Sequence, residues 1–275
     1  MRKGLSVVLM LVSVIMLTVS ICYLGQCREE KQQMLTAVEK LKTTGQSVQP
    51  EIYKKVKREK SGKKKAVKQQ KNDTDQTCHP VSVNLEQIEK ENFCVMAWIE
   101  IPDTPISYPI VQGEDNEYYL THTFQGEESP YGSIFLDCEN NRSFTDSHSV
   151  VYGHNMQDGA MFAFLNQYER PEVMQKYPYI YVYTSDRAFV YRIFSVYQAV
   201  IGDVSYEIGL PLGSLQYAKQ LEQLAYLSEY ETDTPIDAER PFLTLFTCNG
   251  QLTDSERTAV HAILEEEFEK ITKLS

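Results

Sequence analysis

The chain has 275 residues and a formal net charge of −11, enough for one sizeable domain with attached segments. Residues 1–79 hold 16 Lys/Arg and 7 Asp/Glu, a net of +9, whereas residues 80–275 hold 11 and 31, a net of −20. A strongly acidic globular part argues against nucleic acid as its partner, and it favours either basic partners or simple solubility.

The N-terminal segment predicts a membrane anchor. Leu5 to Leu24 is a run of 20 residues without a charge, which as a helix spans roughly 30 Å, the thickness of a bilayer core. Arg2 and Lys3 precede it, so residues 1–4 are expected in the cytoplasm and the rest of the chain outside the cell. The alternative is a cleaved signal peptide, but the run is long for one and no small-x-small Ala site follows it. We therefore expect a single-pass signal-anchor over residues 5–24.

Residues 25–80 are expected to form a basic, flexible stalk. The segment from Arg28 to about Lys42 has a weak helical stripe, which Thr43-Thr44-Gly45 ends. Lys54 to Lys71 is a low-complexity basic run with little to bury. This run is either a solvated spacer or a contact for anionic lipid headgroups or wall polymers.

Residues 81–275 read as one folded domain. Asn84 to Asn92 predicts a short helix with an Asn cap, and Ser214 to about Tyr230 predicts a helical insertion. Eight short apolar runs separated by turn residues predict strands, and eight such strands suggest a closed barrel or a sandwich. The runs are Ala97–Ile101, Ser107–Val111, Gly132–Leu136, Ser149–Tyr152, Ile180–Tyr183, Val190–Val196, Phe242–Thr247 and Thr258–Leu264.

Six cysteines occur without a CxxC pair. Their spacing fits neither a disulfide framework nor a zinc site, so no metal and no cofactor is expected. Whether Cys94 and Cys138 pair stays open.

A thiol and a guanidinium are expected to meet at one end of the sheet. Cys248 ends one predicted strand and Arg257 opens the next, with the polar loop Asn249–Glu256 between them. An antiparallel hairpin sets these two positions side by side. Since a thiol nucleophile needs a base and an oxyanion needs a fixed cation, the pair suggests thiol-based acyl transfer.

Five histidines are candidates for the base. His79 lies at the stalk edge, and His122 and His148 lie in polar, turn-like stretches. His261 falls in the middle of a strand, where a packed structural histidine is the better interpretation. His154 follows a strand at the point where the backbone turns, a position from which scaffolds present catalytic groups, so it is the leading candidate.

The residues around these positions resemble a known family. Leu243-Thr244-Leu245-Phe246-Thr247-Cys248 resembles the TLxTC motif of sortases, the cysteine transpeptidases of Gram-positive surfaces. Six further segments resemble class B sortases in the same order, so that the resemblance covers roughly residues 83–266. They are Trp98–Pro102, Tyr108–Gly113, Asn116–Leu120, Gly132–Asp137, Tyr152–Phe162 and Arg257–Ala262.

The resemblance implies a mostly β fold: a closed eight-stranded barrel with an N-terminal helix and a helical insertion before the Cys strand. It implies that Cys248 is the nucleophile, His154 the acid/base and Arg257 the oxyanion-stabilising or substrate-orienting group. Thr247 is a candidate for the oxyanion hole. Phe246 fills a position where class B members often have a small hydroxyl residue, so it is expected to narrow the pocket or stack on substrate. Two further candidate substrate-binding residues are Leu120 and Tyr226.

The implied activity is cleavage of a C-terminal sorting motif after Thr and transfer of the acyl group to an amine of a lipid-linked cell-wall precursor. The implied partners are secreted proteins that bear the motif. Three alternatives remain: a pilus polymerase with a pilin lysine as acceptor, a cysteine hydrolase of another fold, and a membrane-anchored binding module in which Cys248 is a buried thiol.

Overall fold

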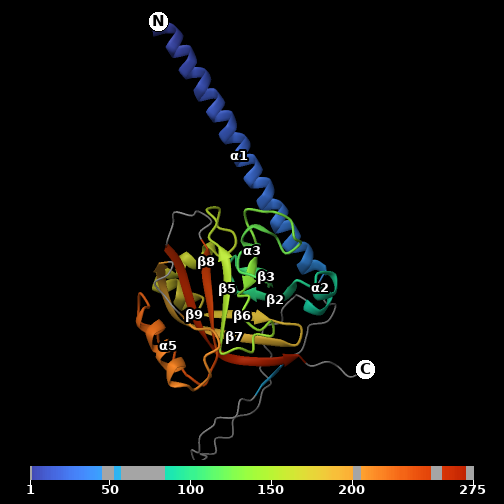
Figure 1. Ribbon diagram of the computed structural model, residues 1–275, viewed down its shortest axis with the longest axis vertical. Helices are drawn as coiled ribbons and strands as arrows, with labels where there is room; N and C mark the ends of the chain where they lie inside the picture. Colours follow the sequence, from blue (N-terminus) through green and yellow to red (C-terminus); the bar gives the residue numbers. More distant parts are fainter. Residues whose placement is uncertain (1, 45–52, 57–83, 201–205, 249–255, 271–275) are drawn as a thin grey trace, which may run out of the picture. The chain divides into compact units, whose positions relative to one another are not determined.

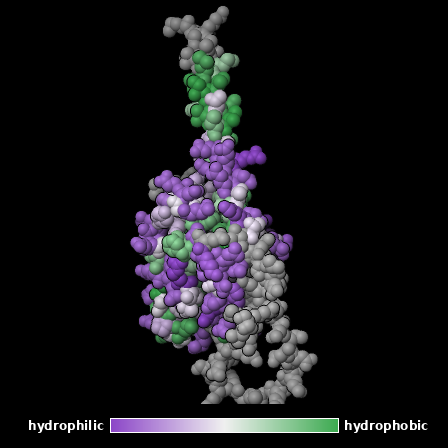
Figure 2. Space-filling model, turned by 90° about the vertical axis from the view of Figure 1, so that its right-hand side faces the viewer, coloured by the Kyte–Doolittle hydropathy of each residue, from purple (hydrophilic) through white to green (hydrophobic). Residues whose placement is uncertain are grey.

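The structure is a computed structural model that describes residues 2–44, 53–56, 84–200, 206–248 and 256–270. The chain divides into two compact units, Met1–Lys40 and Leu41–Ser275. The first unit belongs to α1 (Arg2–Thr44), a single long helix. Figure 2 shows a continuous apolar band along part of this helix. The stretch Met10–Thr43 has the length and composition of a membrane-crossing helix, a test that a signal sequence also passes.

The second unit is built on a β-barrel (Figure 1). The sheet order is β1-β9-β7-β6-β2-β3-β4-β5-β8, and a further pairing between β8 and β9 closes β2 to β9 into a barrel of eight strands. Closure gives each of these eight strands a neighbour on both sides along part of its length. Their bounds are β2 (Val95–Glu100), β3 (Ser107–Val111), β4 (Ile134–Leu136), β5 (His148–His154), β6 (Tyr179–Tyr183), β7 (Arg187–Val200), β8 (Phe242–Cys248) and β9 (Glu256–Lys270).

All eight predicted strands are confirmed, and the closed barrel with them. The largest differences are in length, since β7 has 14 residues and β9 has 15. Both strands continue through polar residues because they pair with each other from Arg187↔Glu269 to Val200↔Glu256. An apolar run marks only the packed part of a strand, so its ends are underestimated.

The helices follow the predictions less closely. α2 (Leu85–Glu91) has the expected cap, with Asn84 Oδ1 accepting from Gln87 N, and α5 (Leu215–Tyr226) begins after the cap Ser214 but ends four residues early. The sequence did not indicate three short helices, because each is too short to show a periodic stripe. They are α3 (Tyr118–Thr121), η1 (Ala163–Glu169) and α4 (Pro171–Lys176).

The helical stripe from Arg28 to about Lys42 is confirmed, since α1 continues through it and ends at Thr44. The expected stalk also contains a strand that was not predicted: β1 (Tyr53–Lys55) pairs antiparallel with the last residues of β9, Phe268–Lys270. The backbone N–H of Val56 also donates to Glu267 O at 2.8 Å. Most of the basic run Lys54–Lys71 lies outside the described residues.

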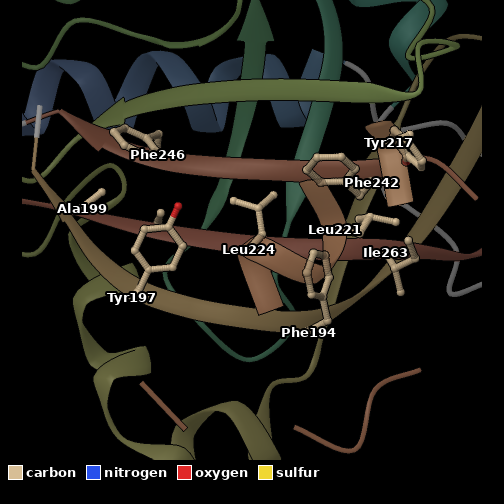
Figure 3. Close-up of a cluster of buried hydrophobic side chains, with 10 residues drawn as sticks. Phe194, Tyr197, Ala199, Tyr217, Leu221, Leu224, Phe242, Phe246 and Ile263 are labelled. Atoms are coloured by element: carbon tan, nitrogen blue, oxygen red, sulfur yellow. The ribbon is translucent and has the colours of Figure 1, made fainter. Parts of the chain in front are cut away.

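An apolar core lies between α5 and the outer face of β7, β8 and β9. Figure 3 shows Tyr217, Leu221 and Leu224 of α5 facing the strands. The strand residues of this core are Phe194, Tyr197, Ala199, Phe242, Phe246, Ala259 and Ile263. α5 therefore covers one part of the barrel face, and this cover stabilises the face along which the candidate site lies.

Candidate active site

The ends of two neighbouring strands bring Cys248 and His154 together. β5 and β8 are parallel and pair in register from His148↔Phe242 to His154↔Cys248. The last pair joins the two candidate residues, and neighbouring strands lie about 4.8 Å apart. Residues 94 positions apart in the sequence thus occupy adjacent backbone positions at one end of the barrel.

The third candidate, Arg257, comes to the same place through β9. β8 and β9 are antiparallel, with register pairs from Phe242↔Ile263 to Phe246↔Ala259. Thr258 N also donates to the side-chain oxygen Thr247 Oγ1 at 2.8 Å. The predicted antiparallel pairing of the two strands is confirmed, with Cys248 the last residue of β8 and Arg257 the second residue of β9.

The side chain of Arg257 is half-buried and lies over an aromatic ring. Its Cζ is 5.8 Å from the ring centroid of Phe246, within the range of a cation–π contact. Its Nε is buried and has no hydrogen-bond partner among the described residues.

The imidazole of His154 is held by α3. Its Nε2 lies 2.6 Å from the carbonyl oxygen of Leu120. Because a carbonyl only accepts, Nε2 carries the proton of this bond. The side chain is 7% exposed.

Two glycines make this arrangement possible. A Cβ on Gly132, where φ is +55°, would lie 2.5 Å from Tyr119 O and 2.6 Å from Leu120 O. A Cβ on Gly153, next to His154, would lie 2.4 Å from Ile134 Cδ1. Any side chain at these two positions would displace α3 or the end of β5.

Comparison with known proteins agrees with this geometry. The sortase domain family matches residues 99–265. Sortase B of Listeria monocytogenes is 32% identical over 167 residues, which cover 61% of this chain and 68% of that protein. Sortase B of Staphylococcus aureus is 26% identical over 180 residues, which cover 66% of this chain and 73% of that protein.

The chain belongs to the class B sortases.

Solved structures carry the same fold. The crystal structure of Bacillus anthracis sortase B in complex with AAEK1 superposes with a TM-score of 0.67 at 25% identity, covering 86% of this chain and 98% of the other. Clostridium perfringens sortase B gives a TM-score of 0.59 at 32% identity, covering 66% of this chain and 98% of the other. The protein is therefore a cysteine transpeptidase of the sortase family.

The other candidate residues of this sortase lie in different surroundings. Thr247 is 1% exposed, and its hydroxyl oxygen accepts a hydrogen bond from Thr258 N, which links β8 to β9. Phe246 is 8% exposed and packs in the core under α5. Leu120 contributes its backbone carbonyl to His154. Tyr226 ends α5 and is 88% exposed.

The prediction for His148 is wrong, because this residue lies in no turn. It begins β5, is fully buried and stacks on Phe242 with ring centroids 3.9 Å apart. His148 Nε2 and His261 Nδ1 both lie 2.8 Å from Thr244 Oγ1. His261 is a packed structural residue in mid-strand, as predicted. Burial lowers the pKa of each of these two histidines to about 3, so both stay neutral at ordinary pH.

The two remaining histidines lie elsewhere. His122 caps the C-terminus of α3 and stacks on Tyr118 at 4.0 Å. His79 lies outside the described residues. Of the four described histidines, only His154 has the register pairing with Cys248.

Sequence reasoning missed a polar cluster beside the site. Asn116 and Tyr152 both donate hydrogen bonds to Asp137, and the hydroxyl of Tyr206 bonds to that of Tyr152. Asn116, Asp137 and Tyr152 lie inside the motif segments that resemble class B sortases. The sequence therefore marked these three residues, but it did not indicate what they do. Within the described ranges, no group of His, Cys, Asp and Glu could hold a metal ion. Cys94 and Cys138 are both free thiols.

Proposed function

We propose that Cys248, His154 and Arg257 form the catalytic centre of this transpeptidase, and that it cleaves a C-terminal sorting motif after Thr. The observation that carries the proposal is the register of three strands. His154 and Cys248 are Cα partners in β5 and β8, and the register of β8 with β9 leads to Arg257. A nucleophile, an acid/base and a cation are thus assigned to one end of the barrel.

The reaction begins with the thiolate of Cys248. An unperturbed thiol is about 3% ionised at pH 7, which suffices because thiolates are strong nucleophiles. The sulfur attacks the carbonyl carbon of the Thr in the sorting motif, and the carbonyl electrons move onto oxygen. His154 starts as the imidazolium, protonated on both ring nitrogens. When the C–N bond breaks, the leaving amine takes the Nδ1 proton of His154, which becomes neutral, and a thioester remains on Cys248.

The second half of the reaction reverses these steps with a new amine. The incoming amine attacks the thioester carbon and gives a proton to Nδ1 of His154, and the Cys248 thiolate leaves. In both halves the bond from Nε2 to Leu120 O holds the imidazole in one tautomer. His154 serves as acid first and as base afterwards.

Arg257 stabilises the oxyanion in both halves. Its buried Nε is one donor that the described residues leave unpaired, and the ring of Phe246 beneath it restricts its position. Phe246 thereby orients the cation, a role that differs from the expected contact with substrate.

The proposal extends to the location of the protein and to the acceptor. We infer that α1 anchors the protein in the cell membrane, with residues 1–4 in the cytoplasm and the catalytic domain outside. There it would meet secreted proteins that bear the motif and a lipid-linked wall precursor whose amine accepts the acyl group. A pilin lysine is the alternative acceptor.

A two-stage assay tests the proposal. Purified protein is first incubated with a panel of peptides that carry candidate sorting motifs, and the acyl-enzyme is trapped with hydroxylamine. Wild type is expected to give the hydroxamate of the peptide ending in Thr, whereas Cys248→Ala gives none. A wall-peptide amine and a lysine-bearing pilin fragment are then supplied separately. A Cys248→Ala variant that still cleaves the peptide would refute the catalytic assignment.

A further inference from the structure

Asp137 is a buried carboxylate that follows β4 and is 5% exposed. No ion pair joins it to a Lys or Arg among the described residues. Three hydrogen bonds satisfy it instead: Oδ1 accepts from Glu139 N, and Oδ2 accepts from both Asn116 Nδ2 and the hydroxyl of Tyr152, each at 2.9 Å. A buried charge is costly without such partners, so this carboxylate fixes the groups around it.

Two series of contacts, here called arms, extend from Asp137. The first arm leads to His154. Asn116 accepts from Cys138 N at 2.9 Å while it donates to Asp137, so it is held on the β4 side by two bonds. Four residues later, Leu120 presents the carbonyl that binds the imidazole. Leu120 belongs to the short helix α3, which begins two residues after Asn116, and Ser133 N donates to Tyr119 O of this helix at 2.9 Å. Asp137 therefore holds one end of the segment whose other end holds His154.

The second arm leads to the insertion that contains α5. The hydroxyl oxygen of Tyr152 lies 3.1 Å from that of Tyr206. The ring of Tyr206 meets Phe246 and His148 edge-on, with centroids 6.4 and 5.1 Å apart. Tyr206 is the first described residue on the way into α5, so this pair ties the insertion to β5 next to the site.

We propose that Asp137 is a positioning residue. Its Oδ2 accepts from Asn116, which leads to His154, and from Tyr152, which leads to Tyr206. Through Asn116 and α3 it sets the imidazole of His154, and through Tyr152 it sets Tyr206. The inference rests on the proposed catalytic role of His154.

The variant Asp137→Asn tests the first arm. An amide has one oxygen and one NH2 group, so its NH2 must face either Glu139 N–H or the donors Asn116 and Tyr152. In either orientation a donor then opposes a donor. Where the opposing donor is Asn116, the segment that carries α3 shifts. A displacement of about 1 Å at an acid/base costs on the order of 100-fold, so kcat is expected to fall by about that factor.

The double variant Asp137→Asn/Asn116→Asp is a matched rescue. This variant exchanges the amide and the carboxylate between the two positions. The new amide at residue 137 donates to the new carboxylate at residue 116 and to the hydroxyl oxygen of Tyr152. The hydroxyl of Tyr152 then donates to Tyr206. Each group has a partner again, and kcat is expected to recover at least about tenfold, the equivalent of one restored hydrogen bond. A double variant no more active than Asp137→Asn would overturn the proposal.

Tyr206→Phe and Tyr152→Phe test the second arm, because each removes one hydroxyl and keeps the ring. Both are expected to raise KM roughly two- to tenfold, the equivalent of one lost hydrogen bond, and to change kcat little. If both leave KM unchanged, the second arm is refuted. These variants keep the proposal testable even where Asp137→Asn fails to fold.

A spectroscopic readout separates positioning from general damage. The Nε2 proton of His154, bonded to a carbonyl, gives a downfield resonance in protein with 15N-labelled histidine, identified by its absence in His154→Ala. It is expected to vanish in Asp137→Asn and return in the double variant. If Asp137→Asn keeps both this resonance and wild-type kcat while His154→Ala is inactive, only the positioning role fails. If His154→Ala itself stays active, the proposed function fails.

Discussion

His148 and His154 begin and end the same strand, and both belong to the face of β5 that carries Tyr152. His148 lies between Phe242 and Thr244, fully buried, and burial lowers its pKa to about 3. His154 lies where β5 ends, bonded to a carbonyl of α3 and paired in register with Cys248. The residue type and the strand are the same, so the surroundings decide which imidazole is structural and which is available for chemistry.

The largest expected effect separates these two histidines. His154→Ala is expected to lower kcat/KM by about 10²- to 10⁴-fold, the usual contribution of an acid/base. His148→Ala is expected to keep most of the turnover but to lower the free energy of unfolding by about 2–4 kcal/mol, since a cavity forms and Thr244 loses one of its two bonds to histidine. Turnover and urea unfolding of both variants check the pair. An inactive but stable His148→Ala would contradict the division.

A second pair of variants compares two arginines. Arg257 and Arg192 each bury an Nε without a partner among the described residues, but Arg192 bonds to Asp233 away from the site. Arg257→Ala is expected to lower kcat/KM by about 10²- to 10³-fold, the effect of a lost oxyanion donor. Arg192→Ala is expected to stay within about twofold, as for a substitution outside the catalytic groups. If Arg257→Ala keeps more than about a tenth of wild-type activity, its assignment is wrong.

The buried pair His148 and His261 predicts a loss of stability in acid. In the folded protein each has a pKa of about 3, whereas an unfolded histidine titrates near 6.5. Below about pH 6 the unfolded state therefore binds protons that the folded state does not, so the folded state loses stability as the pH falls. Each histidine contributes up to about 1.4 kcal/mol per pH unit between pH 6 and 4.

Urea unfolding from pH 7 to 4 measures this loss. His261→Gln is expected to reduce the slope by about half because it removes one of the two titrating groups. His122→Gln is the control, since His122 is only half-buried. An unchanged slope in His261→Gln would show that other groups cause the acid loss.

The smallest effect is expected at the covering helix. Tyr226 is 88% exposed at the end of α5, so Tyr226→Ala is expected to leave the melting temperature unchanged. If the ring contacts substrate, KM for a sorting peptide rises several-fold, as for one lost contact of about 1 kcal/mol. Glu222→Ala, on the exposed side of the same helix, is the matched control. Equal KM values in both variants would remove Tyr226 from the substrate-binding residues.

The sequence predicted the barrel well because each strand has a packed apolar centre, such as Ser107–Val111, which is β3 residue for residue. Strand ends and motif segments also marked Cys248, His154 and Arg257 as candidates, and the structure pairs His154 with Cys248 in register. The buried environment of His148 was not predicted, because its neighbours Phe242 and Tyr206 come from distant parts of the chain. The Asp137 cluster was missed for the same reason: its bonds join four separate segments.

The pairing of β1 with β9 has a practical consequence for soluble forms of the enzyme. A protein shortened to begin at residue 81 would lack Tyr53–Lys55 and leave the backbone of Phe268–Lys270 uncovered on that side. An uncovered strand edge invites the same edge of a second molecule. Shortened preparations would then self-associate through the edge of β9 that β1 covers in the full chain. A protein that begins before Tyr53 is therefore the better choice for work in solution.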